Sequence, residues 1–177
     1  MKFIYLIIFF CVISSSKLVF SQTIAVVNIQ SLIEHNTYYK EIIKDMEINQ
    51  EKYLKKFEFK EKELSDKLND LEQSKLVLNE AEINTQIDNY NKELSVFTLT
   101  IEKFNLHYQN QVINIKQIIL NEIFMLLEKY AIENQVDLIL DSASYLIASN
   151  SIDVTESINK KLQNINLKLE YRKFEEN

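Results

Sequence analysis

The chain has 177 residues, of which 46% are hydrophobic and 26% charged, and it contains no Gly, no Pro and no Trp. The charged fraction is ordinary for a soluble protein and argues against a bundle of membrane helices. Phosphate-binding loops and nucleophile elbows usually need Gly for positive φ or for close approach of the backbone, so the absence of Gly disfavours these sites. A chain without the two strongest helix breakers can form long helices, with Asn and Ser at its turns.

The first 21 residues have the pattern of a secretory signal. Lys2 precedes an apolar run over residues 3–13, which is too short to span a membrane, and Val19 and Ser21 occupy the small-residue positions of a cleavage site. We predict cleavage after Ser21 and a periplasmic location. The alternative is an uncleaved membrane anchor, in which residues 18–20 extend the run beyond Lys17.

The single cysteine, Cys11, lies inside this run without the small residues that precede a lipidated cysteine. The mature chain therefore lacks disulfides and must be held by packing or by oligomerisation. Loss of Lys2 and Lys17 leaves 18 of the 20 basic residues against 26 acidic residues, which gives a charge of −8. This charge argues against nucleic acid as a ligand.

The mature chain opens with a β-prone run over residues 24–29, and residues 30–34 can form one helical turn. A helical tract is predicted from residue 37 to residue 134. Its second half carries an apolar seam with alternating spacings of four and three, which is the pattern of a coiled coil. The seam comprises Ile83, Ile87, Tyr90, Leu94, Phe97, Ile101, Phe104 and Tyr108, and continues less strictly through Val112, Ile115, Ile119, Ile123, Leu126 and Tyr130.

The first half of the tract has a looser seam of Met46, Tyr53, Phe57, Leu64, Leu68 and Leu71. The pattern breaks near residues 75–81, where Asn79 is the most plausible residue to end a helix. We therefore predict two antiparallel helices joined by a tip near residues 74–82. At about 1.5 Å per residue, each arm reaches roughly 60 Å.

The last third of the chain contains two further strand candidates, residues 136–141 and 145–148, separated by a turn at residues 142–144. A final helix is expected from Asp153 to about residue 169, with Asp153 and Glu156 spaced as in a capping box. Residues 171–177 are charged and are expected to fray.

These elements predict an α+β fold, in which a small β-sheet body carries an inserted antiparallel helical hairpin. The body comprises residues 22–38 and 135–170, and the coiled-coil arm comprises residues 39–134. A body of this size is marginally stable alone, so oligomerisation is expected.

Four strings of this sequence are similar to the Skp/OmpH family: IAVVN at 24–28, VDLILD at 136–141, YLIAS at 145–149 and DVTESINKKL at 153–162. The resemblance implies a homotrimer whose helical hairpins surround a cavity. It also implies an ATP-independent periplasmic holding chaperone, without cofactor, for unfolded outer-membrane β-barrel proteins. The alternative is a structural or adaptor coiled coil of the envelope that binds one defined partner.

Seven aromatic residues are candidates for client contact: Tyr53, Phe57, Phe59, Tyr90, Phe97, Phe104 and Tyr108. Aromatic rings offer large contact areas to many sequences. The competing interpretation is that the residues on the seam only fill the space between the helices. Phe59 lies off the seam and is therefore the better candidate.

Well-known members of that family have basic arms, whereas residues 60–82 here carry four lysines against seven acidic residues. Such a tip repels anionic surfaces, so we do not predict a lipopolysaccharide site. His35 and His107 lie far apart without metal-ligand spacing, and no catalytic motif is present. The sequence therefore predicts neither a metal site nor an enzyme.

Overall fold

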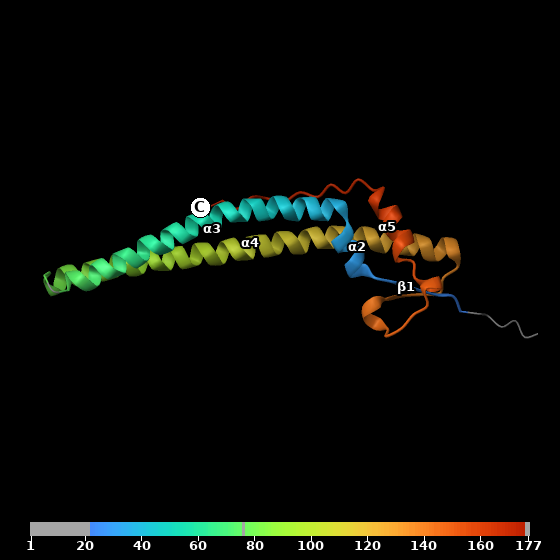
Figure 1. The fold of residues 1–177 in the computed structure, drawn as a ribbon, viewed down its shortest axis with the longest axis horizontal. Coiled ribbons are helices and arrows are strands. Elements are labelled where there is room, and N and C mark those ends of the chain that lie inside the picture. The colour runs from blue at the N-terminus through green and yellow to red at the C-terminus, as the bar shows by residue number, and fades with distance from the viewer. Residues whose placement is uncertain (1–21, 76, 176–177) are drawn as a thin grey trace, which may run out of the picture.

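The computed structural model describes residues 22–75 and 77–175, so the predicted signal lies outside the described part of the chain. A long helical hairpin projects from a small body at one end, and an extended segment runs back along the hairpin (Figure 1). The fold is mostly helical, with one small sheet in the body.

The body is built on two parallel strands, β1 (Ile24–Val27) and β2 (Leu138–Asp141). Ile24 lies opposite Leu138 and Val27 opposite Asp141. Because the hairpin lies between β1 and β2 in the sequence, it is an insertion between two paired strands. Two short helices complete the body, α2 (Ile29–His35) and α5 (Thr155–Gln163). Both helices bury apolar side chains, notably Leu32, Ile158 and Leu162.

The predicted strand at residues 145–148 is wrong. After β2 the chain forms two 3-10 turns, η1 (Ser142–Ser144) and η2 (Asn150–Ile152), and Leu146 and Ile147 between them are 101% and 91% exposed. Asp153 instead takes the place beside β1 through a single bridge to Val26, whose carbonyl accepts a hydrogen bond from the Val154 amide at 2.9 Å. β-propensity alone does not make a strand, because strand formation depends on packing against neighbouring strands, and Leu146 and Ile147 pack against nothing in the described chain.

The hairpin consists of α3 (Thr37–Ser74) and α4 (Glu80–Asn134), which confirms the predicted tract and tip. Asn36 caps α3 by accepting the Tyr39 amide at 3.0 Å. Asn79 caps α4 in a capping box with Glu82, so Asn79 begins the second helix rather than ending the first. α4 ends at Gln135 in the left-handed conformation with a φ of 52°. Gly usually serves there, and this chain has none.

Most of the predicted seam forms the core of the arm, but Leu68 and Leu94 are exposed. Its buried members are Met46, Phe57, Leu64, Leu71, Phe104, Tyr108, Ile115, Ile119 and Ile123. Toward the tip, Ile83, Ile87 and Tyr90 are only half-buried. Near the body, Leu127 is buried and Leu126 half-buried, because α4 there packs against α2, β2 and α5 as well as α3.

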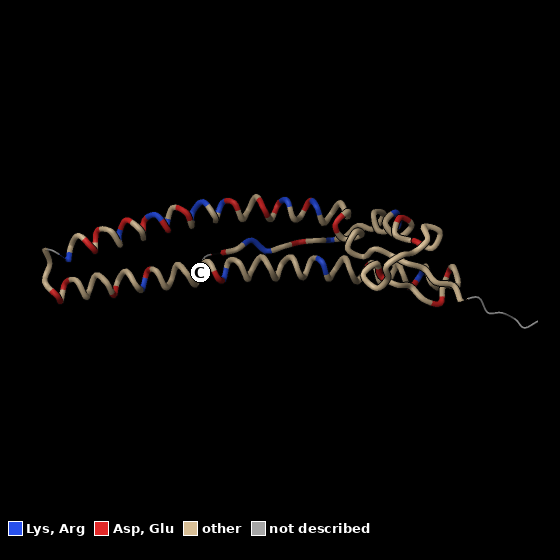
Figure 2. The backbone as a smooth tube through the Cα atoms, turned by 60° about the horizontal axis from the view of Figure 1, so that its bottom comes forward, with Lys and Arg blue, Asp and Glu red and all other residues tan. Residues whose placement is uncertain are grey.

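The final helix ends at Gln163 rather than near residue 169, and the expectation that the chain end frays is also wrong for its described part. Residues 165–175, here called the tail, run between α3 and α4 (Figure 2). Ile165, Leu167, Leu169 and Tyr171 are apolar at every second position, which suits an extended chain and not a helix. The arm covers these side chains because they share one side of the tail.

Candidate functional site

Five of the seven predicted aromatic residues meet in one cluster midway along the arm. Tyr53 and Phe57 come from α3, and Phe97, Phe104 and Tyr108 come from α4. Phe104 is central: its ring centroid lies 5.5 Å from that of Tyr53, 5.1 Å from Phe57 and 5.0 Å from Tyr108. The heptad spacing places these rings on facing helix surfaces, and each such pair contributes about 0.5–1.5 kcal/mol beyond area burial.

A sixth ring, Phe174, enters the cluster from the tail and was not among the predicted contact residues. Its centroid lies 5.4 Å from Tyr53, 5.4 Å from Phe104 and 5.7 Å from His107, in edge-to-face arrangements. Phe174 is 7% exposed although it lies only three residues before Asn177. The alternating apolar pattern before it was the available signal that this segment packs in an extended form.

The arm also satisfies the backbone of the tail. The Tyr53 hydroxyl donates to the Phe174 carbonyl at 2.5 Å. His107 Nε2 lies 2.7 Å from the Arg172 carbonyl, which can only accept, so Nε2 carries the proton. The Arg172 amide donates to Gln111 Oε1 at 3.4 Å. The role of His107 is therefore to hold the tail, between the rings of Tyr108 and Phe174.

Tyr171 attaches the tail to α3, because its hydroxyl donates to Asp45 Oδ2 at 2.8 Å. Burial, followed by the hydrogen bond and the charge of Asp45, raises the pKa of Tyr171 to about 12. Burial likewise raises the pKa of Tyr108, whose hydroxyl donates to Asn49. Both tyrosines are therefore neutral hydrogen-bond donors at ordinary pH.

The two remaining candidates lie apart from the cluster. Phe59 is 73% exposed and lines a groove with Phe57, Val96 and Phe97, and four lysines, 56, 60, 67 and 92, border that groove. Lys67 forms an ion pair with Glu93 at 2.6 Å across the two helices. Tyr90 lies on the other flank of the seam, in a groove lined by Leu64, Leu68, Leu94 and Ile101 among others.

A second apolar surface lies on α4 away from the seam. Leu99, Leu106 and Ile113 recur at seven-residue spacing and are 51%, 55% and 54% exposed. Val96, Ile118, Phe124, Met125 and Ile132 are further exposed apolar side chains of α4. We call Leu99, Leu106 and Ile113 the α4 stripe.

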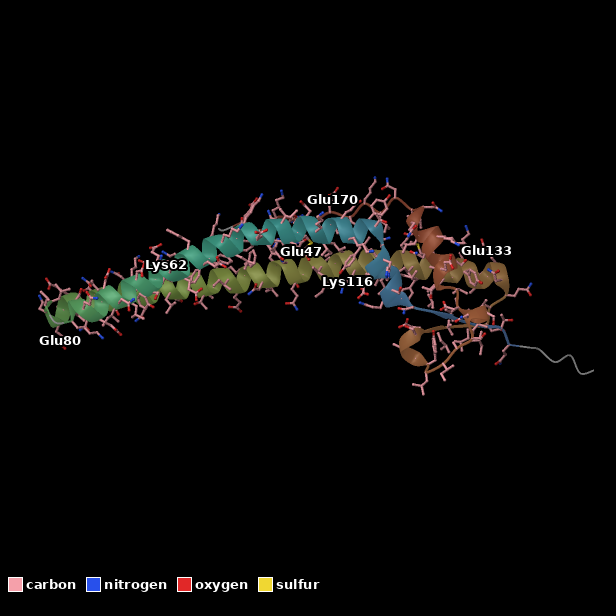
Figure 3. All side chains as sticks on the ribbon, viewed as in Figure 1. Glu47, Lys62, Glu80, Lys116, Glu133 and Glu170 are labelled. Carbon is pink, nitrogen blue, oxygen red and sulfur yellow. The ribbon has the colours of Figure 1, made fainter. Side chains whose placement is uncertain are left out.

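Charge is distributed unevenly between the two helices. Lys and Asp or Glu follow one another closely along α3 and are sparse along α4 (Figure 2). Side chains cover the whole arm, with Lys62 on α3 and Glu80 at the tip (Figure 3). The arm thus has one charged helix and one helix with a largely uncharged outer surface.

Within residues 22–75 and 77–175, no three His, Cys, Asp or Glu side chains are grouped so that they could hold a metal ion. In the same ranges, no helix combines the length and the hydropathy of a membrane span.

Comparison with known proteins gives one family and one fold. The family profile described as "Outer membrane protein (OmpH-like)" matches residues 23–162. The crystal structure of an OmpH-like protein from Caulobacter crescentus CB15, described there as a candidate outer membrane chaperone, superposes with a TM-score of 0.61 at 10% identity. The match covers 81% of this chain and 85% of that one, and at this identity it shows a shared fold. No curated protein matches the chain.

Proposed function

The chain belongs to the OmpH-like family of outer membrane proteins, and from this premise we propose that it is an ATP-independent holding chaperone of the periplasm. Proteins of this family are periplasmic and non-enzymatic. In our proposal the mature protein, beginning at Gln22, binds unfolded outer-membrane β-barrel proteins and prevents their aggregation. The OmpH-like fold supports this role.

The observation that carries the proposal is the α4 stripe. The hairpin buries its seam, yet Leu99, Leu106 and Ile113 remain about half exposed along a weakly charged helix surface. A soluble protein rarely leaves a long apolar surface without a binding role. Such a stripe along a projecting arm suits a client that offers apolar side chains over an extended length.

Outer-membrane strands are such clients. Each strand alternates apolar and polar side chains, and its backbone groups are unpaired before the barrel closes. Full burial of an exposed Leu or Ile side chain contributes about 1.5–3 kcal/mol. Each side chain of the stripe is already half covered, so a client gains less than this from each contact. Several weak contacts of this kind hold a client without selecting one fold.

We further propose that the body joins three chains into a homotrimer. The exposed side chains of Leu146 and Ile147 lie in the body, close in sequence to the half-exposed Leu138 of β2. Closed symmetric assembly is the usual way to cover such surfaces. Three arms with their stripes directed inward would then enclose a client.

The charge of the arm sets the client class. Lys60 and Lys67, two of the lysines of residues 60–82, are paired with Glu63 or Glu93, and the acidic residues outnumber the basic ones there. We therefore propose recognition through apolar contacts, without a lipopolysaccharide site. Binding of clients should be tolerant of salt.

The test is the light scattering of an outer-membrane β-barrel protein diluted from urea, with and without the purified mature protein. We expect suppression at one trimer per client, at low and at moderate salt. The variant Leu99→Gln/Leu106→Gln/Ile113→Gln should need a roughly tenfold higher concentration for half suppression, because three apolar contacts are weakened. Ile48→Gln/Leu54→Gln, which alters similarly exposed residues of α3, is the matched control and should behave as the wild type.

Absence of suppression by a well-folded wild-type oligomer would reject the chaperone and favour an adaptor with one folded partner. Equal activity of the stripe variant and the wild type would reject the stripe as the client surface. Mass measurement of the secreted protein checks cleavage after Ser21.

A further inference from the structure

We propose that the groove now filled by the tail is a binding site for an extended polypeptide segment with apolar side chains at alternate positions. In this proposal residues 165–175 are a built-in occupant that a client segment displaces. The inference deepens the proposed function, since it rests on a client being an unfolded polypeptide. It places a defined site on the arm, separate from the α4 stripe.

The first support is the sequence pattern of the occupant. Leu167 is buried, and Ile165, Leu169 and Tyr171 are half-buried, whereas residues 166, 168 and 170 are exposed. From residue 165 to residue 171 the groove thus covers every second side chain, a period of two like that of a β-strand, and Phe174 follows after a spacing of three. The backbone of this part is pleated by turns, because the Leu167 and Leu169 amides donate to the carbonyls two residues before them at 3.0 Å. Strands of outer-membrane barrels show the same alternation and carry aromatic residues at their ends.

The second support is the way in which the arm binds backbone atoms. Tyr53 and His107 donate to two carbonyls of the tail, and Gln111 accepts from the Arg172 amide. Hydrogen bonds to backbone groups do not depend on which side chains the bound segment carries. The same three side chains can therefore serve any extended segment of suitable apolar pattern.

The third support is the aromatic socket for Phe174. Tyr53, Phe104 and His107 surround this ring, and Phe104 is only 3% exposed while the tail is bound. Phe174 belongs to no helix or strand, so the tail can leave the arm without unfolding such an element. When the tail leaves, Phe174 leaves with it and the socket is uncovered. An aromatic side chain of another segment can then enter.

The fourth support is the position of the tail relative to the family. The family profile matches up to residue 162, and the tail begins at residue 165, so the occupant lies outside the matched range. The groove itself is built from α3 and α4, which lie inside the matched range. A covalently attached occupant competes at an effective concentration of the order of millimolar, so only clients with several contacts displace it.

The experiment uses the mature full-length protein and a fluorescent peptide with the sequence of residues 163–175 as the probe. The variant Tyr171→Ala/Phe174→Ala weakens the tail in place, and Lys173→Ala, an exposed tail position, is the matched control. We expect saturable binding of one peptide per chain, at least tenfold tighter to the double variant than to the wild type or to Lys173→Ala. A peptide in which Leu167 and Lys168 are exchanged, as are Leu169 and Glu170, should bind at least tenfold more weakly.

A further variant, Tyr53→Phe, tests the backbone contact. Introduced into Tyr171→Ala/Phe174→Ala, it keeps the ring but removes the donor to the Phe174 carbonyl, and it should weaken peptide binding several-fold. Absence of saturable binding to the folded double variant would overturn the proposal, as would equal affinity for the peptide with exchanged residues. Circular dichroism verifies folding of each variant.

The aggregation assay separates this proposal from the proposed function. If the double variant binds the peptide and suppresses aggregation at lower concentration than the wild type, the groove is a client site. If the wild type suppresses aggregation but the double variant neither binds the peptide nor improves, the chaperone stands and the groove proposal is rejected. Peptide binding without suppression by any variant retains the site and rejects the chaperone.

Discussion

Single asparagines cap the starts of α2, α3 and α4, whereas α5 begins after Val154 without a side-chain cap. Asn28, Asn36 and Asn79 each accept an amide of the first helical turn with their side chains. The composition predicted that Asn would replace Gly and Pro at turns, and the capping preference explains why. The left-handed conformation of Gln135 could not be predicted. A glutamine side chain gives no preference for positive φ, so the sequence does not indicate which residue after α4 adopts it.

Asn36 is the residue whose replacement has the clearest expected effect. It is fully buried between α2 and α3, and its Oδ1 accepts the Tyr39 amide. Its Nδ2 has no hydrogen-bond partner among the residues that the structure describes. Asn36→Ala loses the cap and should lower the free energy of unfolding by about 1 kcal/mol. Asn36→Ser keeps an acceptor for the Tyr39 amide and removes the buried Nδ2, so it should be neutral within about 0.5 kcal/mol.

Urea unfolding followed by circular dichroism measures both variants. Equal stability of Asn36→Ala and the wild type would show that the cap contributes nothing. A Ser variant as unstable as the Ala variant would show that packing of the whole side chain is what matters.

At the level of elements, the arm could be predicted and the tail could not. The seam repeats for many heptads, so its helices, their antiparallel pairing and the tip were visible in the sequence. The cluster of Tyr53, Phe57, Phe97, Phe104 and Tyr108 follows from that seam. Phe174 was missed because no repeat in the sequence links the tail to the arm. The few alternating apolar residues of the tail also directly follow a helix, so they could be taken for its continuation. The strand expected at residues 145–148 failed for a related reason: propensity does not tell whether a run packs against the sheet.

The attachment of the tail should depend on pH through Tyr171. Its pKa is raised from 10.0 to about 12 while its hydroxyl is bound to Asp45 and near Tyr108. A raised pKa means that docking is fully favoured below pH 10.0 and is lost as the pH rises toward 12. Ionisation removes the proton that Asp45 accepts and sets two negative charges side by side.

Titration of tyrosinate absorbance checks this expectation. The difference between wild type and Tyr171→Phe should show one group titrating near pH 12. Tyr145→Phe, which alters a tyrosine of the body just after η1, serves as the control. A difference curve centred at pH 10.0 would mean that the tail is free in solution.

For the whole molecule, the uncovered surfaces of the body predict assembly. Leu146 and Ile147 are 101% and 91% exposed in the single chain. If they lie in the subunit interface of the proposed homotrimer, Leu146→Ser/Ile147→Ser should weaken association at least tenfold, because each buried side chain contributes about 1.5–3 kcal/mol. Val77→Ser, at the tip and 85% exposed, is the matched control.

Sedimentation analysis over a range of concentrations gives the mass of each variant. A monomeric wild type would contradict the homotrimer. A double variant that keeps the wild-type mass would place the interface elsewhere on the body.

The pairing of Ile24 with Leu138 also sets an order of events. Synthesis releases β1 first, and its only strand partner among the described residues follows 114 positions later. Closing so long a loop from a random chain is slow and entropically costly, whereas a hairpin that forms first brings its two ends together. The arm is then the template on which the sheet is assembled. Substitutions near the tip should slow folding, while those in the strands should mainly speed unfolding.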